Sequence, residues 1–151
     1  MISNNLGEVC VTYKYHNSLK NRPSISCYKD AHNIIKQLIT DETIGLQEQF
    51  VVLYLNNASK LIGSYAGFSG AINSTVVDFK IIAVTALKLM ASRVIVAHNH
   101  PSGLMKPSTQ DIALTERLKS SLKLLEIELI DHLIVGPEDE CFSFAEERLM
   151  N

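Results

Sequence analysis

Hydrophobic and polar residues follow two spacings along the chain, and each spacing predicts a different kind of element. Short apolar or alternating segments, rich in β-branched residues and tyrosine, predict strands with one or both faces buried. These strands are expected at residues 9–15, 50–55, 60–65, 93–97 and 127–135. Two asparagines, Asn56 and Asn57, separate the second segment from the third, which predicts a hairpin there.

Helical spacing occupies the stretches between these strands. Leucines recur at positions 114, 118, 122 and 125 and predict a helix over residues 109–125. Two further helices are expected at 31–39 and from an Asp78 cap to Met90. The order β-α-β-β-α-β-α-β predicts an α/β fold with a mixed β-sheet flanked by helices. The glycines at 63, 67 and 70 predict a flexible or tightly turned segment after the third strand.

Length and composition indicate a single domain. A chain of 151 residues, 46% of them hydrophobic, is long enough to bury one core. No apolar run approaches the ~20 residues that a membrane span needs, so we expect no membrane association. Cys10, Cys27 and Cys141 form no Cys-x-x-Cys pair, and no secretory signal is evident. Free thiols in a reducing cytoplasm are therefore expected.

Candidate chemistry is concentrated at residues 97–111, which read AHNHPSGLMKPSTQD. Because alternate side chains of a strand point the same way, we expect His98 and His100 on one face and Asn99 on the other. A proline and a glycine follow, and they predict that the backbone leaves the sheet directly after the histidines.

The next helix is expected to begin at the other end of the same segment. Ser108 is the predicted N-cap and Asp111 the third helical residue, so the carboxylate would face the strand end. Two imidazoles and a carboxylate are three ligands for one Zn²⁺ and leave a fourth position open, as in catalytic zinc sites. Ser-x-x-Asp before an apolar stripe is also a capping pattern that needs no metal, and the two roles are compatible.

The spacing of these residues resembles the JAMM signature of JAB/MPN metalloproteases: His-x-His-Pro, with seven residues between His100 and Ser108, then two residues before Asp111. With the later segment LIDHLIVG, the chain resembles the RadC-like branch over about residues 25–150. The resemblance implies a JAB/MPN fold, related in architecture to the cytidine deaminases. It also implies that His98, His100 and Asp111 bind zinc and that Ser108 helps to stabilise a tetrahedral intermediate.

The same resemblance predicts how the chain is divided. Residues 1–24 would form an N-terminal strand or extension, and residues 25–151 a RadC-like JAB/MPN domain. RadC proteins often carry an N-terminal helix-hairpin-helix region that binds DNA. The first 40 residues here lack its glycine-bearing hairpins, so an isolated JAB domain is expected.

The family also needs a glutamate from another strand, and Glu48 is the match because it stands just before a strongly apolar strand. Without the resemblance, it could equally be a solvated glutamate at a strand edge. Glu42, in a polar turn, and Glu8, near the N-terminus, are weaker candidates. As a general base, Glu48 would take a proton from the attacking water and deliver one to the leaving amine.

Three function classes follow from these residues. The leading one is a zinc-dependent metallopeptidase or isopeptidase acting on a peptide or isopeptide substrate. The second is a DNA-repair or other nucleic-acid-associated module with a structural or vestigial metal, which the net charge of −2 does not support. The third, a zinc deaminase, is weakest because the Pro-Cys-x-x-Cys ligand pattern is absent. The sequence decides neither the substrate nor the oligomeric state.

The remaining histidines do not have ligand spacing. His132 lies in an apolar strand, where a structural hydrogen-bonded histidine is the favoured interpretation. A role for Asp131 or His132 behind the metal ligands is the alternative. His16 and His32 belong to the N-terminal region, away from the candidate site.

Overall fold

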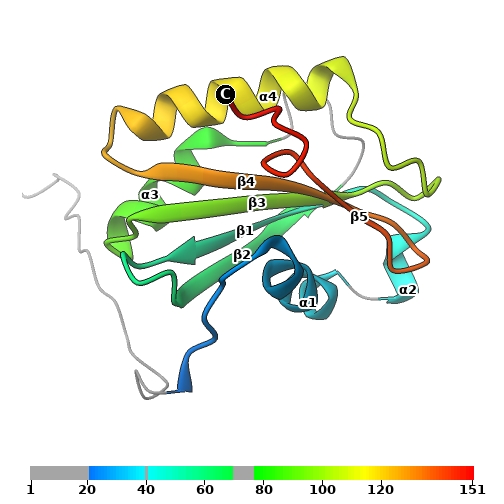
Figure 1. Cartoon of the computed structure of the whole chain (residues 1–151), viewed down its shortest axis with the longest axis horizontal. Coiled ribbons are helices and arrows are strands. Elements are labelled where there is room, and N and C mark those ends of the chain that lie inside the picture. Colours follow the sequence, from blue (N-terminus) through cyan, green and yellow to red (C-terminus); the bar gives the residue numbers. More distant parts are fainter. Residues whose placement is uncertain (1–20, 40, 70–76) are drawn as a thin grey trace, which may run out of the picture.

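A mixed five-stranded sheet forms the centre of the molecule, in the order β2-β1-β3-β4-β5 (Figure 1). The computed structural model describes residues 21–39, 41–69 and 77–151. The strands are β1 (Gln49–Leu55), β2 (Leu61–Ser69), β3 (Arg93–Asn99), β4 (Glu128–Val135) and β5 (Cys141–Ser143). Only β3 and β4 run parallel among these neighbours, and the other pairs are antiparallel. The predicted mixed sheet is confirmed.

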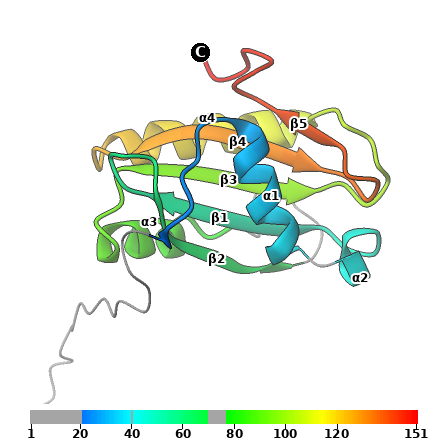
Figure 2. The same cartoon turned by 60° about the horizontal axis from the view of Figure 1, so that its bottom comes forward.

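Helices cover both faces of this sheet. Figure 2 shows α1 (Tyr28–Leu38) across one face, with α3 (Phe79–Lys88) and α4 (Thr109–Lys123) behind the other. A short helix, α2 (Asp41–Ile44), lies between α1 and β1 in the chain. The α/β class predicted from the order of elements is therefore confirmed.

β1 is buried on both faces, which explains why its sequence is a continuous apolar run rather than an alternating one. Val51, Leu53 and Leu55 pack into the cluster that includes α1 residues. Phe50, Val52 and Tyr54 point the other way, into the cluster with α3 and α4. A strand buried on both faces needs apolar residues at every position, and every residue of β1 after Gln49 is buried.

Some sequence predictions differ from the structure. Gly63 and Gly67 do not form a turn; they lie inside β2, where Gly63 pairs with Tyr54 of β1. A Cβ at position 63 would lie 2.6 Å from Leu89 Cδ1, so glycine allows α3 to end close to the sheet. Helix α2 and strand β5 were not predicted, and the predicted strand 9–15 and Gly70 lie outside the described residues.

β4 contains one more residue than its partner at a single point. Val94 pairs with Leu129, and Ile95 pairs with Asp131, so Ile130 has no counterpart in the parallel ladder. Such a bulge shifts the alternation of side chains beyond it. After the shift, His132 stands beside Val96 and faces the same side of the sheet as α4.

Hydrogen bonds of the Asp131 side chain hold residues 143–145 against β4. Its carboxylate accepts hydrogen bonds from Ser143 Oγ at 2.6 Å, from the Ala145 amide at 3.0 Å and from the His132 amide at 2.8 Å. Burial nevertheless raises the pKa of this carboxyl, because it penalises the charged form more than the three donors stabilise it.

The pKa of Asp131 predicts how stability changes with pH. An acid whose pKa is raised in the folded state loses stability as pH rises from its unfolded pKa through the raised value. Asparagine does not titrate, so the free energy of unfolding of Asp131→Asn, relative to wild type, should increase as pH rises above the unfolded pKa of about 3.9. Urea unfolding at several pH values measures this difference.

Asp139 provides a control with the opposite sign. A hydrogen bond from Lys36 Nζ, 2.7 Å from Oδ1, lowers the pKa of this exposed carboxyl. Wild type therefore gains stability above the unfolded pKa, and Asp139→Asn should become less stable relative to wild type as pH rises. Slopes of the same sign in the two variants would contradict the assignment.

Candidate metal centre

The candidate site begins where β3 ends. The strand extends through His98 to Asn99, two residues beyond the apolar pattern that predicted it. The His100 amide donates to Val135 O at 2.9 Å, which holds this residue against the end of β4. The chain then turns at Gly103, whose φ of 75° lies in the left-handed region that favours glycine.

The first turn of α4 places the carboxylate. Asp111 N donates to Ser108 Oγ at 3.1 Å, and Ser108 N donates to Asp111 Oδ2 at 2.7 Å. This reciprocal capping box is the arrangement that the sequence predicted. It fixes the Asp111 side chain toward the end of β3, so the cap and the candidate ligand are the same group.

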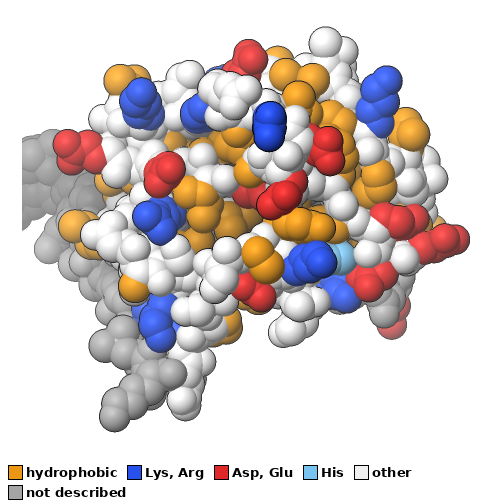
Figure 3. Space-filling view, viewed as in Figure 1, with side chains coloured by type: hydrophobic (Ala, Val, Ile, Leu, Met, Phe, Trp, Pro, Cys, Tyr) orange, Lys and Arg blue, Asp and Glu red, His pale blue; other side chains and the backbone are white. Residues whose placement is uncertain are grey.

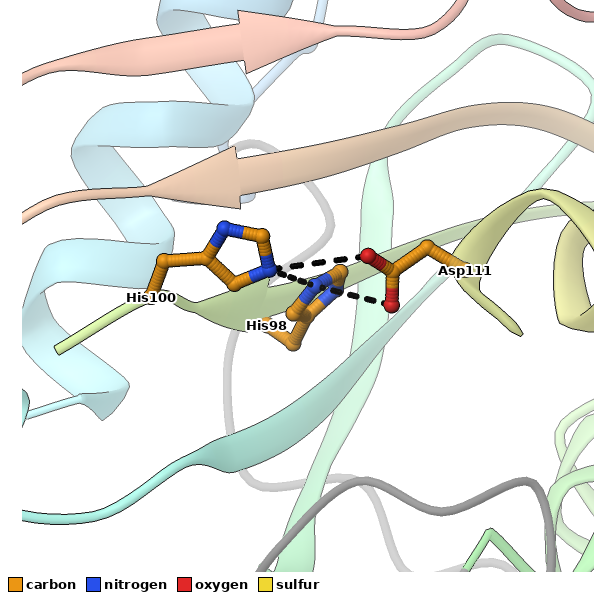
Figure 4. Close-up of side chains that lie close together, drawn as sticks. All are labelled: His98, His100 and Asp111. Carbon is orange, nitrogen blue, oxygen red and sulfur yellow. Dashed lines mark hydrogen bonds and ion pairs between the residues drawn. The ribbon is translucent and has the colours of Figure 1, made fainter. Parts of the chain in front are cut away.

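Figure 4 shows both histidines and the aspartate converging on one point. The Nε2 atoms of His98 and His100 are 3.0 Å apart. His98 Nε2 lies 3.3 Å from Asp111 Oδ1, and His100 Nε2 lies 3.5 Å from Oδ2. Ligands about 2.0–2.1 Å from a tetrahedral Zn²⁺ are separated by roughly 3.3 Å, so the donor set fits this ion. No other His, Cys, Asp and Glu cluster of three or more within the described ranges could hold a metal ion.

The proton on His100 is placed by a backbone carbonyl. His100 Nδ1 is 2.7 Å from Leu104 O, and a carbonyl only accepts, so Nδ1 carries the hydrogen. The lone pair of a neutral His100 therefore lies on Nε2, the atom that faces Asp111. Zinc-binding histidines are commonly held in this way, with one ring nitrogen donating to a fixed acceptor.

A longer chain of hydrogen bonds places the proton on His98. Thr115 Oγ1 donates to Asp111 O at 2.6 Å, so it must accept from His132 Nδ1, also at 2.6 Å. Burial lowers the pKa of His132 well below its usual value and keeps it neutral, which leaves Nε2 as an acceptor. His98 Nδ1 donates to that atom at 2.7 Å, and the lone pair of His98 therefore faces the cluster. The sequence favoured a structural role for His132, with a position behind the metal ligands as the alternative, which this contact supports.

The charges of the cluster favour a bound cation. Burial alone would raise the pKa of Asp111, but the His100 and His98 rings, which donate to it from Nε2 when protonated, outweigh burial and hold that pKa well below its usual range. The Asp111 partner raises the pKa of His100, against the effect of burial. Two ring lone pairs and a carboxylate that face one another in a buried place are stable only with a proton or a metal ion between them.

Thr115 allows the hydrogen-bond chain to be tested without touching a ligand. Thr115→Val keeps the shape but leaves the His132 Nδ1 hydrogen without an acceptor, so the orientation of His98 is no longer fixed. We expect zinc affinity to fall about 10–100-fold, the usual loss for such an outer partner. Competition with a chromophoric chelator measures it. Thr115→Ser keeps the hydroxyl and should bind zinc as wild type does; equal loss in both variants would contradict the role of the hydroxyl.

A cleft of about 710 Å³ opens beside the cluster. Glu48 and Ser108, both predicted from the sequence as catalytic, line it together with His100 and Asp111. The negative charge of Glu48 is among the causes that raise the pKa of His100, which places the two groups in one electrostatic environment. Glu42 is exposed and does not line the cleft, and Glu8 lies outside the described residues.

Asn99 is a functional candidate that the sequence interpretation placed on the opposite face and left without a role. Its completely buried side chain accepts from the Gln49 amide at 2.6 Å. Its Nδ2 donates to Ile44 O at 2.7 Å and to Gln47 O at 2.9 Å. These three bonds hold the segment that carries Glu48 against the strand that carries the histidines.

Comparison with known proteins agrees with this geometry. A model of the RadC-like JAB domain matches residues 25–149. This chain belongs to the RadC-like JAB domain family. The family match includes every residue of the candidate centre and its cleft, and the resemblance inferred from the sequence is confirmed.

Several relatives of this RadC-like domain carry the name UPF0758 protein. One from Porphyromonas gingivalis is 40% identical over 129 residues, which cover 85% of this chain and 56% of the relative. One from Pseudoalteromonas translucida is 42% identical, over 82% of this chain and 57% of the relative. UPF0758 protein YeeS of Escherichia coli is 48% identical over 70% of this chain and 72% of its own length. The chain thus spans little more than half of the first two relatives.

Other features of the RadC-like domain bear on the remaining function classes. The metal cluster contains no cysteine, and Cys27 and Cys141 are free thiols. On the face shown in Figure 3, lysine and arginine side chains are interspersed with acidic ones rather than gathered into one basic surface. Among the described helices, none has the length and apolar character to cross a bilayer. His32 lies apart from the centre on α1, 3.6 Å from Asp139.

Proposed function

We propose that this RadC-like domain is a zinc-dependent hydrolase that cleaves a peptide or isopeptide bond. The observation that carries the proposal is the convergence of His98, His100 and Asp111, with both histidine protons tied to acceptors on the far side of each ring. Such a site leaves a coordination position open toward the cleft that Glu48 and Ser108 line. A vestigial site has no physical need to retain all five groups.

In the proposed hydrolysis, the bound zinc, Glu48 and Ser108 would each have a different role. Bound zinc would polarise the scissile carbonyl and make hydroxide available near neutral pH. The Glu48 carboxylate would take the proton of the attacking water and return a proton to the leaving amine. The Ser108 hydroxyl accepts from Asp111 N, so its own hydrogen is available to the oxygen that becomes negative. Free thiols in the described part agree with the proposed cytoplasmic location.

Metal content tests the proposal first. Protein purified without chelator should contain about one zinc per chain, and His100→Ala should contain none. The wild-type protein should hydrolyse fluorogenic peptide or isopeptide substrates, lose activity after dialysis against a chelator, and regain it when zinc is added. A well-folded wild-type protein without affinity for zinc would reduce Ser108 and Asp111 to a helix cap and overturn the proposal.

A further inference from the structure

Two large apolar side chains stand exposed among the residues that line the cleft. Leu46, on the segment before β1, is 81% exposed, and Leu104, on the loop after β3, is 62% exposed. Pro101 and Pro107 add apolar surface to the same lining. A single exposed leucine needs no explanation, but apolar side chains gathered around a cleft mark a ligand-binding surface.

The backbone segments that carry both leucines are held by Asn99 and His100, at the end of β3. Asn99 Nδ2 donates to Ile44 O and Gln47 O, which lie on either side of Leu46 in the chain. His100 Nδ1 donates to the carbonyl of Leu104 itself. The backbone that carries the two leucines is therefore fixed relative to the candidate metal centre, and a preformed site loses less entropy when it binds its ligand.

The charge of the cleft restricts the kind of ligand. Among the described residues that line it, Lys106 is the one lysine and there is no arginine. Glu48 and Asp111, which belong to the proposed catalytic machinery, give the floor negative charge. A strongly anionic ligand such as a nucleic-acid backbone would need several cations, whereas an uncharged apolar group matches the exposed leucines and prolines of the lining.

We propose that the cleft selects peptide segments with a large apolar side chain, such as leucine, next to the scissile bond, and that Leu46 and Leu104 contact this side chain. The inference rests on the proposed hydrolase function for the meaning of the scissile bond. It adds the substrate class, which the metal centre alone does not determine.

Binding without turnover separates this inference from the function on which it rests. The probe is a pair of fluorescent hexapeptides that differ in one central residue, leucine or glutamine. Their dissociation constants are measured with zinc-loaded Glu48→Gln protein, in which hydrolysis should be strongly slowed. We expect the leucine peptide to bind at least about tenfold more tightly. Adding Leu46→Gln or Leu104→Gln should bring the ratio of the two constants toward one.

Leu124→Gln is the matched control, because Leu124 is 86% exposed and does not line the cleft. It should leave the ratio unchanged. Equal binding of the two peptides by the parent protein, or binding of neither, would overturn the inference. Hydrolysis of both peptides by wild type at equal rates would overturn it while the hydrolase function stands. Preferential binding of the leucine peptide without hydrolysis by wild type would instead retain the cleft and reject the function.

Discussion

The Glu48→Gln variant is expected to lose about 10²–10⁴-fold in kcat/KM for a peptide substrate while it keeps the zinc content of wild type. The reason is that glutamine has nearly the shape of glutamate but cannot take a proton from the attacking water. Glu48 lines the cleft and is not one of the three convergent ligand residues, so its loss should not empty the metal site.

The measurement is steady-state hydrolysis together with zinc content on the same preparations. Glu42→Gln is the control, because Glu42 is an exposed glutamate on neighbouring α2 and does not line the cleft. It should hydrolyse at the wild-type rate. Undiminished turnover in Glu48→Gln, with wild-type zinc content, would remove Glu48 from the mechanism.

Replacing Asp111 is expected to have the largest effect on the metal. Asp111→Ala removes one of three ligands, and zinc affinity should fall by more than the roughly 100-fold that loss of an outer partner can cost. It also removes the acceptor for the Ser108 amide, so the free energy of unfolding of the metal-free protein should fall by about 1 kcal/mol for the lost cap. Isothermal titration with zinc and urea unfolding measure the two effects.

Asp111→Asn separates the ligand from the cap. The asparagine oxygen can still accept from Ser108 N, so the metal-free variant should be more stable than Asp111→Ala by about the contribution of the cap. An uncharged amide is a poor zinc ligand, and this variant should lose zinc as well. Wild-type zinc affinity in Asp111→Asn would show that the carboxylate serves the helix alone.

Local periodicity was enough to predict the main parts of the candidate site. Alternation along a strand placed His98 and His100 on the same side, and their Nε2 atoms are 3.0 Å apart. Capping chemistry placed Asp111 on the first turn of α4, and the capping box is present. These predictions succeeded because both rules depend on residues within a few positions of one another.

The hydrogen bonds that hold the candidate ligands in place join residues far apart in the chain, so no local sequence pattern predicts them. Asn99 bonds to the segment that ends at Gln49, 50 positions earlier in the chain, and Thr115 meets His132 across the gap between α4 and β4. A polar residue between two histidines, or a threonine in a helix, carries no sign of such a partner. Likewise, β5 has three residues and is too short to show alternation.

The place of His132 depends on a residue that does not contact it in the site. Ile130 is the extra residue of β4, and it changes which side chains of that strand face α4. If β4 kept all its residues but paired with β3 without this bulge, strict alternation from Leu129 would turn His132 toward α1, and His98 Nδ1 would lose its acceptor. The candidate centre therefore depends on how β4 pairs with β3 as well as on the chemistry of its residues. A relative that shares every ligand and this number of residues, but pairs the two strands without the bulge, would have to orient its first histidine by some other means.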